Sequence, residues 1–175
     1  MKNNRKVEVI DYQIDWNKKF EDESEILREI LKDIIVDIHH IGSTAIPNIK
    51  AKPIIDILIE VKEIDKVDQF NDKLIQQGYI PLGENQIPNR RFFIKGDEIN
   101  RTHHVHVFQT GNPEIARHIR FRDYLINHPD EAKAYSDLKD DLAKKYSYNI
   151  EEYIKGKDHF IKEIDQKAMK EQEAR

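Results

Sequence analysis

The sequence predicts an α+β fold in a single domain that spans residues 1–175. Two observations carry this prediction. Short β-like runs rich in Ile and Val alternate with helical segments over the first two thirds of the chain, and the last third shows helical periodicity alone. In addition, 175 residues is an ordinary length for one domain with one core. We therefore expect a small mixed β-sheet with packed helices and a helical C-terminal third.

The predicted elements follow from apolar residues at alternating or helical spacing. In order, they are an edge strand at 7–10, a helix from Asp15, strands at 34–41 and 54–61, a helix at 65–77, strands at 90–95 and 103–108, and helices that open at Asn112, Pro129 and Asn149. Asp15 is the expected N-cap of the first helix, and the polar stretch 165–175 is expected to fray.

The strand at 54–61 is the best candidate for a buried central strand, because both of its faces are largely apolar. It follows a turn at Gly42-Ser43-Thr44 and a segment in which Pro47 and Pro53 rule out a regular strand. Alternate residues of the preceding strand, from Ile34 to His40, are expected to share one face. The two later strands are close enough in the sequence to form a hairpin.

Composition and charge exclude several classes of function. The net charge is −4 with acids and bases interleaved, which argues against a general nucleic-acid binder. The chain has no cysteine, so disulfides and thiolate metal sites are excluded. Residues 1–12 lack the apolar stretch of a signal peptide, and no apolar run is long enough to span a bilayer. We expect a cytoplasmic protein without a membrane partner, and the sequence leaves its oligomeric state open.

Asp56 lies in the predicted central strand. A carboxylate is rarely buried unless it is paired, so this residue needs a partner. One interpretation makes it a metal ligand, with Glu60 on the same face nearer the strand end. The other is an ion pair with Lys50, Lys52 or an arginine. The sequence alone leaves both interpretations open.

Histidines gather on two of the predicted strands. His39 and His40 end the first, and His103, His104 and His106 lie on the last. His104 and His106 are two residues apart, so their side chains point to one face. This spacing suits a pair of metal ligands or phosphate contacts. Alternatively, the histidines belong to a polar strand surface and form hydrogen bonds with their neighbours.

Basic residues flank the predicted hairpin. Arginine forks suit phosphate groups, and Arg90 and Arg91 are the candidates for that role. The alternative is a solvated face on which each arginine pairs with one of the many acids. A turn glycine beside hydroxyl groups, as at Gly42-Ser43-Thr44, could also hold phosphate, although Gly-Ser is an ordinary turn dipeptide.

Several motifs in the same order resemble the GrpB family. They are HIGSTAIPNIKAKPIIDILI (His40–Ile59), RRFF (Arg90–Phe93), RTHHVHV (Arg101–Val107) and FRDYL (Phe121–Leu125). The resemblance extends from about Val7 to about Ile164. It implies a nucleotidyltransferase-like fold, in which helices pack on a small mixed sheet. It does not imply a settled activity.

The nucleotidyltransferase pattern implies a two-metal site, from which this sequence departs. In that superfamily Gly-Ser precedes two acids on the next strand, a later strand adds a third, and together they hold two Mg²⁺ ions. Here Gly42-Ser43 matches, Asp56 takes the place of one acid of the pair, and Ile54 or Leu58 takes the other, depending on the register. The later strand offers histidine, which favours Zn²⁺ or Mn²⁺ over Mg²⁺.

The leading hypothesis is a protein that binds a nucleotide or another phosphate-containing small molecule. If this protein is an enzyme, we expect a nucleotidyltransferase with a remodelled metal site. The residues expected to bind phosphate are Gly42, Ser43, Thr44, Lys52, Arg90 and Arg91. Asp56 is expected to be catalytic and to hold a divalent metal ion (Mg²⁺, Mn²⁺ or Zn²⁺) with His104 and His106. Two alternatives stay open: a non-catalytic binding module with a degenerate active site, and a histidine-metal phosphohydrolase.

Overall fold

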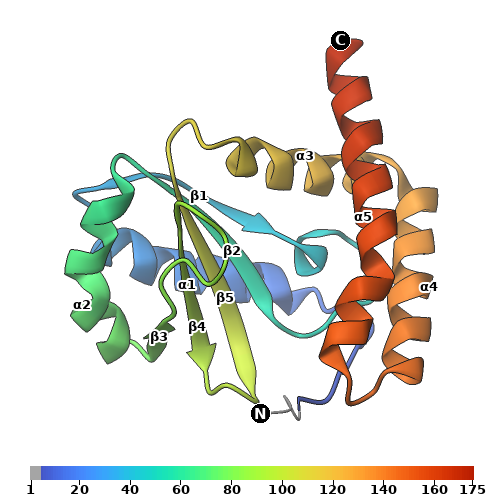
Figure 1. The fold of residues 1–175 in the computed structure, drawn as a ribbon, viewed down its shortest axis with the longest axis horizontal. Helices are drawn as coiled ribbons and strands as arrows, with labels where there is room; N and C mark the ends of the chain where they lie inside the picture. Colours follow the sequence, from blue (N-terminus) through green and yellow to red (C-terminus); the bar gives the residue numbers. More distant parts are fainter. Residues whose placement is uncertain (1–4) are drawn as a thin grey trace.

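The computed structural model describes residues 5–175, so the first four residues of the predicted domain lie outside it. Its centre is a five-stranded mixed sheet in the order β1-β2-β5-β4-β3 (Figure 1). The strands are β1 (Ile35–Ile41), β2 (Ile55–Val61), β3 (Tyr79–Pro81), β4 (Arg90–Gly96) and β5 (Arg101–Gln109). The β2–β5 pair is parallel and the other pairs are antiparallel. The predicted α+β class with a mixed sheet and a β4–β5 hairpin is therefore confirmed.

Helices cover the sheet and form the C-terminal third of the chain. They are α1 (Asp15–Ile30), the 3₁₀ turns η1 (Ser43–Ala45) and η2 (Ile64–Phe70), α2 (Asn71–Gln76), α3 (Pro113–Asn127), α4 (Pro129–Lys145) and α5 (Ile150–Glu173). Figure 1 shows α4 and α5 side by side, with the last turns of α5 projecting beyond the rest of the molecule. Among residues 5–175, no helix is long and apolar enough to cross a membrane.

The two faces of the sheet are covered differently because strand side chains alternate between them. One face packs against α1, η2 and α2. Its core consists of Trp16, Leu27, Leu31, Ile57, Ile59, Val61, Val67, Leu74, Phe93, Val105 and Val107 among others. The opposite face meets α3 through a smaller cluster of Ile41, Leu58, Phe108 and Ile115. This second face also carries Asp56, His104 and His106, which are only partly covered.

The C-terminal helices form a separate apolar cluster with the segment between β1 and β2. Its members are Ile46, Ile49, Tyr124, Leu125, Ala132, Tyr135, Ile164 and Ala168. Through this packing α4 and α5 are held against the loop that enters β2, beside the open face of the sheet. Because Ala168 is buried in this cluster, α5 continues to Glu173 where the sequence predicted fraying from Asp165.

Several predicted details of the N-terminal half are wrong. The run at 7–10 is no strand: Ile10 makes one isolated bridge to Ala51, while the Val7 N–H donates to the Ser147 carbonyl at 2.7 Å. Its alternation reflects burial under the C-terminal helices, where Val7 is packed. At the first helix, Asp15 is the first helical residue and the N-cap position belongs to Ile14.

Local irregularities explain the remaining differences. The ladder between β1 and β2 shifts register between Ile35 and Asp37, which turns Val36 out to solvent, so the face expected from Ile34 to His40 is interrupted. The helix predicted at 65–77 is divided into the 3₁₀ turn η2 and the short α2. The strand β3 was not predicted, because its three residues are too few for a periodic signal.

Candidate anion-binding site

The parallel pairing of β2 with β5 brings an acid and two histidines together. Asp56 pairs with His104 and Leu58 with His106, so all these side chains share the face that α1 does not cover. His104 Nδ1 and His106 Nε2 each lie 3.5 Å from the same oxygen, Asp56 Oδ1. The Asp56 side chain remains 30% exposed. The sequence prediction that these three residues lie close together is thus met by the geometry, whereas a role in metal binding stays a prediction.

Each histidine has an arginine behind it. Arg90 Nη1 lies 3.1 Å from His106 Nδ1, and Arg101 Nη1 lies 3.4 Å from His104 Nε2. A guanidinium group only donates hydrogen bonds, so both of these ring nitrogens accept. The hydrogen-bond network therefore assigns the proton of each neutral imidazole to the nitrogen that faces Asp56.

These contacts keep Asp56 ionised. Burial alone would raise its pKa, but the hydrogen bonds from His104 and His106 outweigh burial and hold the pKa of the carboxyl well below its usual range. Burial in turn lowers the pKa of His104 against the attraction of Asp56. Asp56 is thus an anionic carboxylate at neutral pH, held by hydrogen bonds from two imidazole rings.

The turn after β1 closes around this carboxylate. Gly42 has φ +73°, and a Cβ atom there would lie 2.6 Å from Asp56 Oδ2, so no other residue fits. Thr44 Oγ1 is 2.8 Å from Nε2 of the buried His40, whose ring stacks on Phe20. Burial lowers the pKa of His40 to about 4, which makes this histidine a neutral support for the turn.

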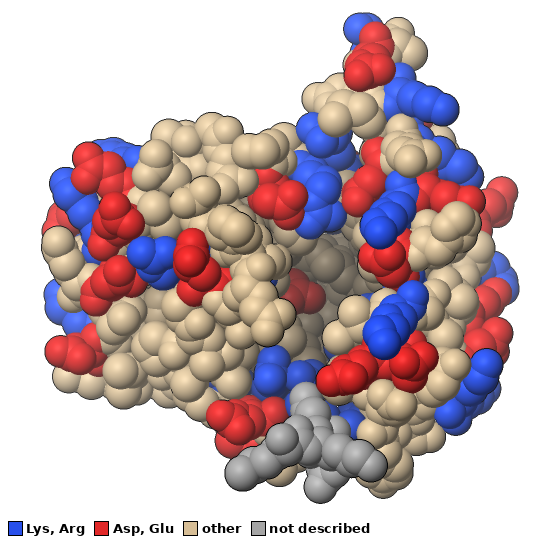
Figure 2. Space-filling view, viewed as in Figure 1, with Lys and Arg blue, Asp and Glu red and all other residues tan. Residues whose placement is uncertain are grey.

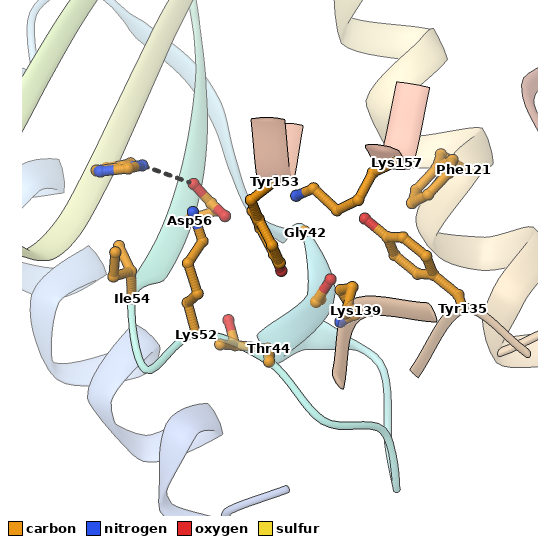
Figure 3. A pocket seen from close by; sticks show the side chains of 13 residues that line it. Gly42, Thr44, Lys52, Ile54, Asp56, Phe121, Tyr135, Lys139, Tyr153 and Lys157 are labelled. Atoms are coloured by element: carbon orange, nitrogen blue, oxygen red, sulfur yellow. Dashed lines mark ion pairs between the residues drawn. The ribbon is translucent and has the colours of Figure 1, made fainter. Parts of the chain in front are cut away.

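Three lysines from three elements enter the pocket in front of this turn. Lys52 precedes β2, Lys139 lies on α4 and Lys157 on α5, and together with Asp56 they line a cavity of about 140 Å³ (Figure 3). Burial is the main cause that lowers the pKa of Lys52 to about 7, of Lys139 to about 6 and of Lys157 to about 8. Repulsion from Lys157 lowers the first two further.

Two tyrosines complete the wall that the C-terminal helices provide. The Tyr135 ring lies 4.5 Å from Lys139 Nζ, and the Tyr153 ring lies 4.6 Å from Lys157 Nζ, so the same Tyr-x-x-x-Lys arrangement occurs on α4 and on α5. The Tyr135 hydroxyl also forms a hydrogen bond with Ser43. The Tyr153 hydroxyl is buried without a hydrogen-bond partner within residues 5–175.

The cavity opens on the side shown in Figure 2, where the surface is hollowed between the body that carries the sheet and the C-terminal helices. A second cavity of about 330 Å³ adjoins it and shares Lys52 and Ile54 with it. Arg5, Lys6 and Arg101 line this second cavity together with the single acid Glu8, so it is rich in cations as well.

The structure brings most of the predicted site residues to one place. Gly42, Ser43, Thr44, Lys52, Asp56 and His104 line the cavity. Arg90 is buried behind His106, where it also donates to the carbonyls of Glu84 and Asn85. Arg91 lies apart, because it points to the α1 face and pairs with Asp68 at 2.9 Å and Asp65 at 3.4 Å. We therefore leave Arg91 out of the site.

Four polar residues of the cavity were not predicted as site residues: Lys139, Lys157, Tyr135 and Tyr153. Helical periodicity assigns the tyrosines to the core positions of amphipathic helices and leaves the lysines among the solvated residues. The repeated Tyr-x-x-x-Lys spacing was the one available signal, since it places an aromatic ring and an ammonium group on one side of each helix.

A metal ion could contact only a limited set of these residues. Within residues 5–175, no group of three or more His, Asp or Glu side chains is arranged to hold one. A histidine that binds a metal usually donates its outer N–H to a carboxylate or a carbonyl. His104 and His106 instead face arginine donors on the outer side, which leaves the proton where a metal would bind.

Fold and site together define an α+β protein with a cation-lined pocket at the start of a parallel strand pair. Residues 6–167 match the family described as GrpB protein, and the chain belongs to the GrpB family.

The relatives agree with this assignment. The chain is 51% identical over 164 residues to the UPF0157 protein YqkA of Bacillus subtilis, covering 94% of this chain but only 48% of that protein. It is 36% identical to the glutamate-rich protein GrpB of Alkalihalophilus pseudofirmus, covering 93% of this chain and 95% of the relative. The crystal structure of conserved protein GrpB from Enterococcus faecalis has a TM-score of 0.90 at 44% identity, covering 94% and 98% of the two chains.

Proposed function

We propose that this protein binds a small molecule through a phosphate group in the pocket between β2, α4 and α5, with nucleotides as one class of such ligands. The observation that carries the proposal is the convergence of Lys52, Lys139 and Lys157, from three separate elements, on one cavity. Lysines are rarely brought together under burial without an anion to offset their repulsion.

The groups around the cavity complement a phosphate. When protonated, Lys52 and Lys157 can each donate several hydrogen bonds, while Lys139 uses one donor for the Lys50 carbonyl. Ser43 and Tyr153 line the same space with their hydroxyl-bearing side chains. Because the Tyr153 hydroxyl is buried without a partner within residues 5–175, a bound oxygen acceptor would satisfy it. A cavity of about 140 Å³ is smaller than a typical site for a whole drug-sized ligand, so it suits the phosphate end, with the rest of the molecule in the adjoining cavity.

Nucleotidyl transfer on a nucleotidyltransferase-like fold is the second candidate. It is favoured by one observation: Gly42-Ser43 and Asp56 meet in space, as the superfamily pattern requires, with His104 and His106 beside the acid. In this form of the proposal, Asp56 is catalytic and holds a divalent metal ion with the histidines. A single acid at the cavity and the arginines behind both histidines count against it.

Calorimetric titration of the purified protein tests the binding proposal. Inorganic phosphate, pyrophosphate and ATP would be titrated without metal and with Mg²⁺, Mn²⁺ or Zn²⁺. We expect binding without metal and a loss of roughly tenfold or more in affinity in Lys157→Met, because a charge-assisted contact disappears. Lys155→Met is the matched control on the same helix, since Lys155 is 72% exposed.

The outcomes separate the candidates. If none of these anions binds the wild type, or if both lysine variants lose affinity alike, the pocket is not a phosphate site. Release of pyrophosphate from ATP that depends on Mn²⁺ or Zn²⁺ and is lost in Asp56→Asn would support the transferase. Binding without turnover would support a non-catalytic module.

A further inference from the structure

The two oxygens of Asp56 have different surroundings. The hydrogen bonds described for this carboxylate within residues 5–175 both fall on Oδ1, from His104 and His106. Oδ2 lies on the side of Gly42, which lines the cavity. Figure 3 shows one Asp56 oxygen joined to an imidazole by a dashed line and the other directed toward the middle of the pocket. One oxygen thus fixes the carboxylate, and the other is presented to a ligand.

This second oxygen is unusual in its setting, because the other polar side chains of the cavity are donors or hydroxyls. In their ammonium form Lys52, Lys139 and Lys157 only donate, and the hydroxyl of Thr44 is engaged with His40. Oδ2 is therefore the anionic acceptor of the pocket. A phosphate dianion placed against it would be repelled, so an organic group that meets Oδ2 must be a hydrogen-bond donor.

Histidine protonation makes this arrangement specific. Since Arg90 and Arg101 occupy the outer ring nitrogens, both imidazole protons point to Oδ1 and hold the carboxylate plane in one orientation. Gly42 then leaves room beside Oδ2 that any side chain would fill. His104 and His106 act as positioning residues for the acceptor in this arrangement.

We propose that the ligand is a phosphorylated compound with a free hydroxyl or amino group, which places its phosphate on the lysines and donates a hydrogen bond from that group to Asp56 Oδ2. This rests on the proposed function and narrows it, because phosphate binding alone would not require a second group. Phosphorylated sugars, polyols and nucleotides belong to this class.

A matched pair of test compounds examines the proposal. Glycerol 3-phosphate carries hydroxyls and propyl phosphate carries none, and at about pH 7.5 both phosphates are mainly dianions that cannot donate. We expect the wild type to bind glycerol 3-phosphate roughly tenfold more tightly than propyl phosphate, which is the usual effect of a hydrogen bond to a charged group. In Asp56→Asn the preference should fall below about threefold, because the Oδ2 position becomes an amide donor.

Glu60→Gln is the control for the loss of charge. It removes one charge from the same face of β2 at its other end, where Glu60 accepts a hydrogen bond from Thr110, and should keep the full preference. Equal binding of the two compounds, or no binding of either, overturns the proposal, as does an unchanged preference in Asp56→Asn. Equal binding that is still weakened by Lys157→Met would overturn it while leaving the phosphate site itself intact.

A second measurement needs no variant. Long-range ¹H–¹⁵N correlation spectra distinguish the two neutral tautomers of histidine. We expect the proton on Nδ1 in His104 and on Nε2 in His106, which are opposite tautomers on neighbouring positions of one strand face. His159, which is 88% exposed, provides the solvent reference. A proton on the other nitrogen in either residue would remove the basis for the orientation of Asp56.

Discussion

Two carboxylates lie on opposite faces of the same sheet, and they differ in how completely they are paired. Glu23 on α1 accepts hydrogen bonds from Tyr79 Oη at 2.6 Å and from Lys95 Nζ at 2.7 Å, and its side chain is 8% exposed. The partners of Asp56 are 3.5 Å away, and its side chain is 30% exposed.

Adjacent histidines of β5 show the same contrast. His103 points to the face of Glu23, and His104 points to the face of Asp56. The hydrogen bonds to Glu23 are short, and the carboxylate is enclosed by the protein. Burial and the nearby carboxylate of Glu23 raise the pKa of Tyr79 well above its usual range, so the Tyr79 hydroxyl stays protonated and donates. A carboxylate saturated by its own protein serves the fold, whereas one with an oxygen left over is available to a ligand.

The largest expected effect is on the free energy of unfolding, and it concerns Glu23 rather than Asp56. Glu23→Gln removes the charge that pairs with Lys95 and should lower the free energy of unfolding by about 3 kcal/mol, the usual cost of breaking a buried pair. Urea denaturation measures this change. Phosphate affinity should stay at the wild-type value, since Glu23 lies on the other face; a parallel loss of affinity would show that the two faces are coupled.

A smaller loss is expected at the turn beside Asp56. Gly42→Ala forces a Cβ atom into φ +73°, ψ −171° and against Oδ2, which should lower the free energy of unfolding by about 2 kcal/mol. Here affinity for glycerol 3-phosphate should fall as well, because the carboxylate must move. Gly111→Ala is the control for the backbone conformation alone, since Gly111 has φ +87° and an added methyl group there would meet nothing within 4 Å among residues 5–175. If both variants bind alike, the close approach of Gly42 to Asp56 has no part in the site.

The smallest effect concerns the charge of the pocket. Lysines are cationic below their pKa, so the pocket is most positive below pH 6 and loses charge as the pH rises through the values of about 6, 7 and 8 for Lys139, Lys52 and Lys157. Sulfate keeps its charge over this range, and its affinity should fall on the order of tenfold from about pH 6 to about pH 9. Calorimetry at several pH values would show the fall; a flat profile would mean that the lysines stay fully charged.

The sheet half of the site could be predicted from the sequence. An acid in an Ile-rich strand needs a partner, and two histidines at alternate positions share a face. Those two local rules singled out the three residues, and the resemblance to the nucleotidyltransferase pattern, in which a later strand completes the site, joined Asp56 with His104 and His106. The same rules could not place Arg91, because alternation assigns a residue to one of two faces without saying which face holds the pocket.

The helical half of the site depends on packing between distant parts of the chain. Lys139 and Lys157 look like ordinary surface lysines in their own helices, and only the docking of α4 and α5 on the segment before β2 turns them inward. No local pattern encodes that docking. For the same reason the strand predicted at 7–10 is wrong, because Val7 in this run donates to Ser147, which lies between α4 and α5.

The division of the pocket between a sheet and a helix pair also bears on how its specificity could change. The strand pairing of β2 with β5 holds Asp56 in register with the hydrophobic core, so substitutions there carry a cost in folding. Positions 139 and 157 lie on α4 and α5, outside that pairing. New ligand preferences can therefore arise most readily at Lys157 while the sheet keeps the acceptor in place, since Lys139 is itself buried and donates to the Lys50 carbonyl.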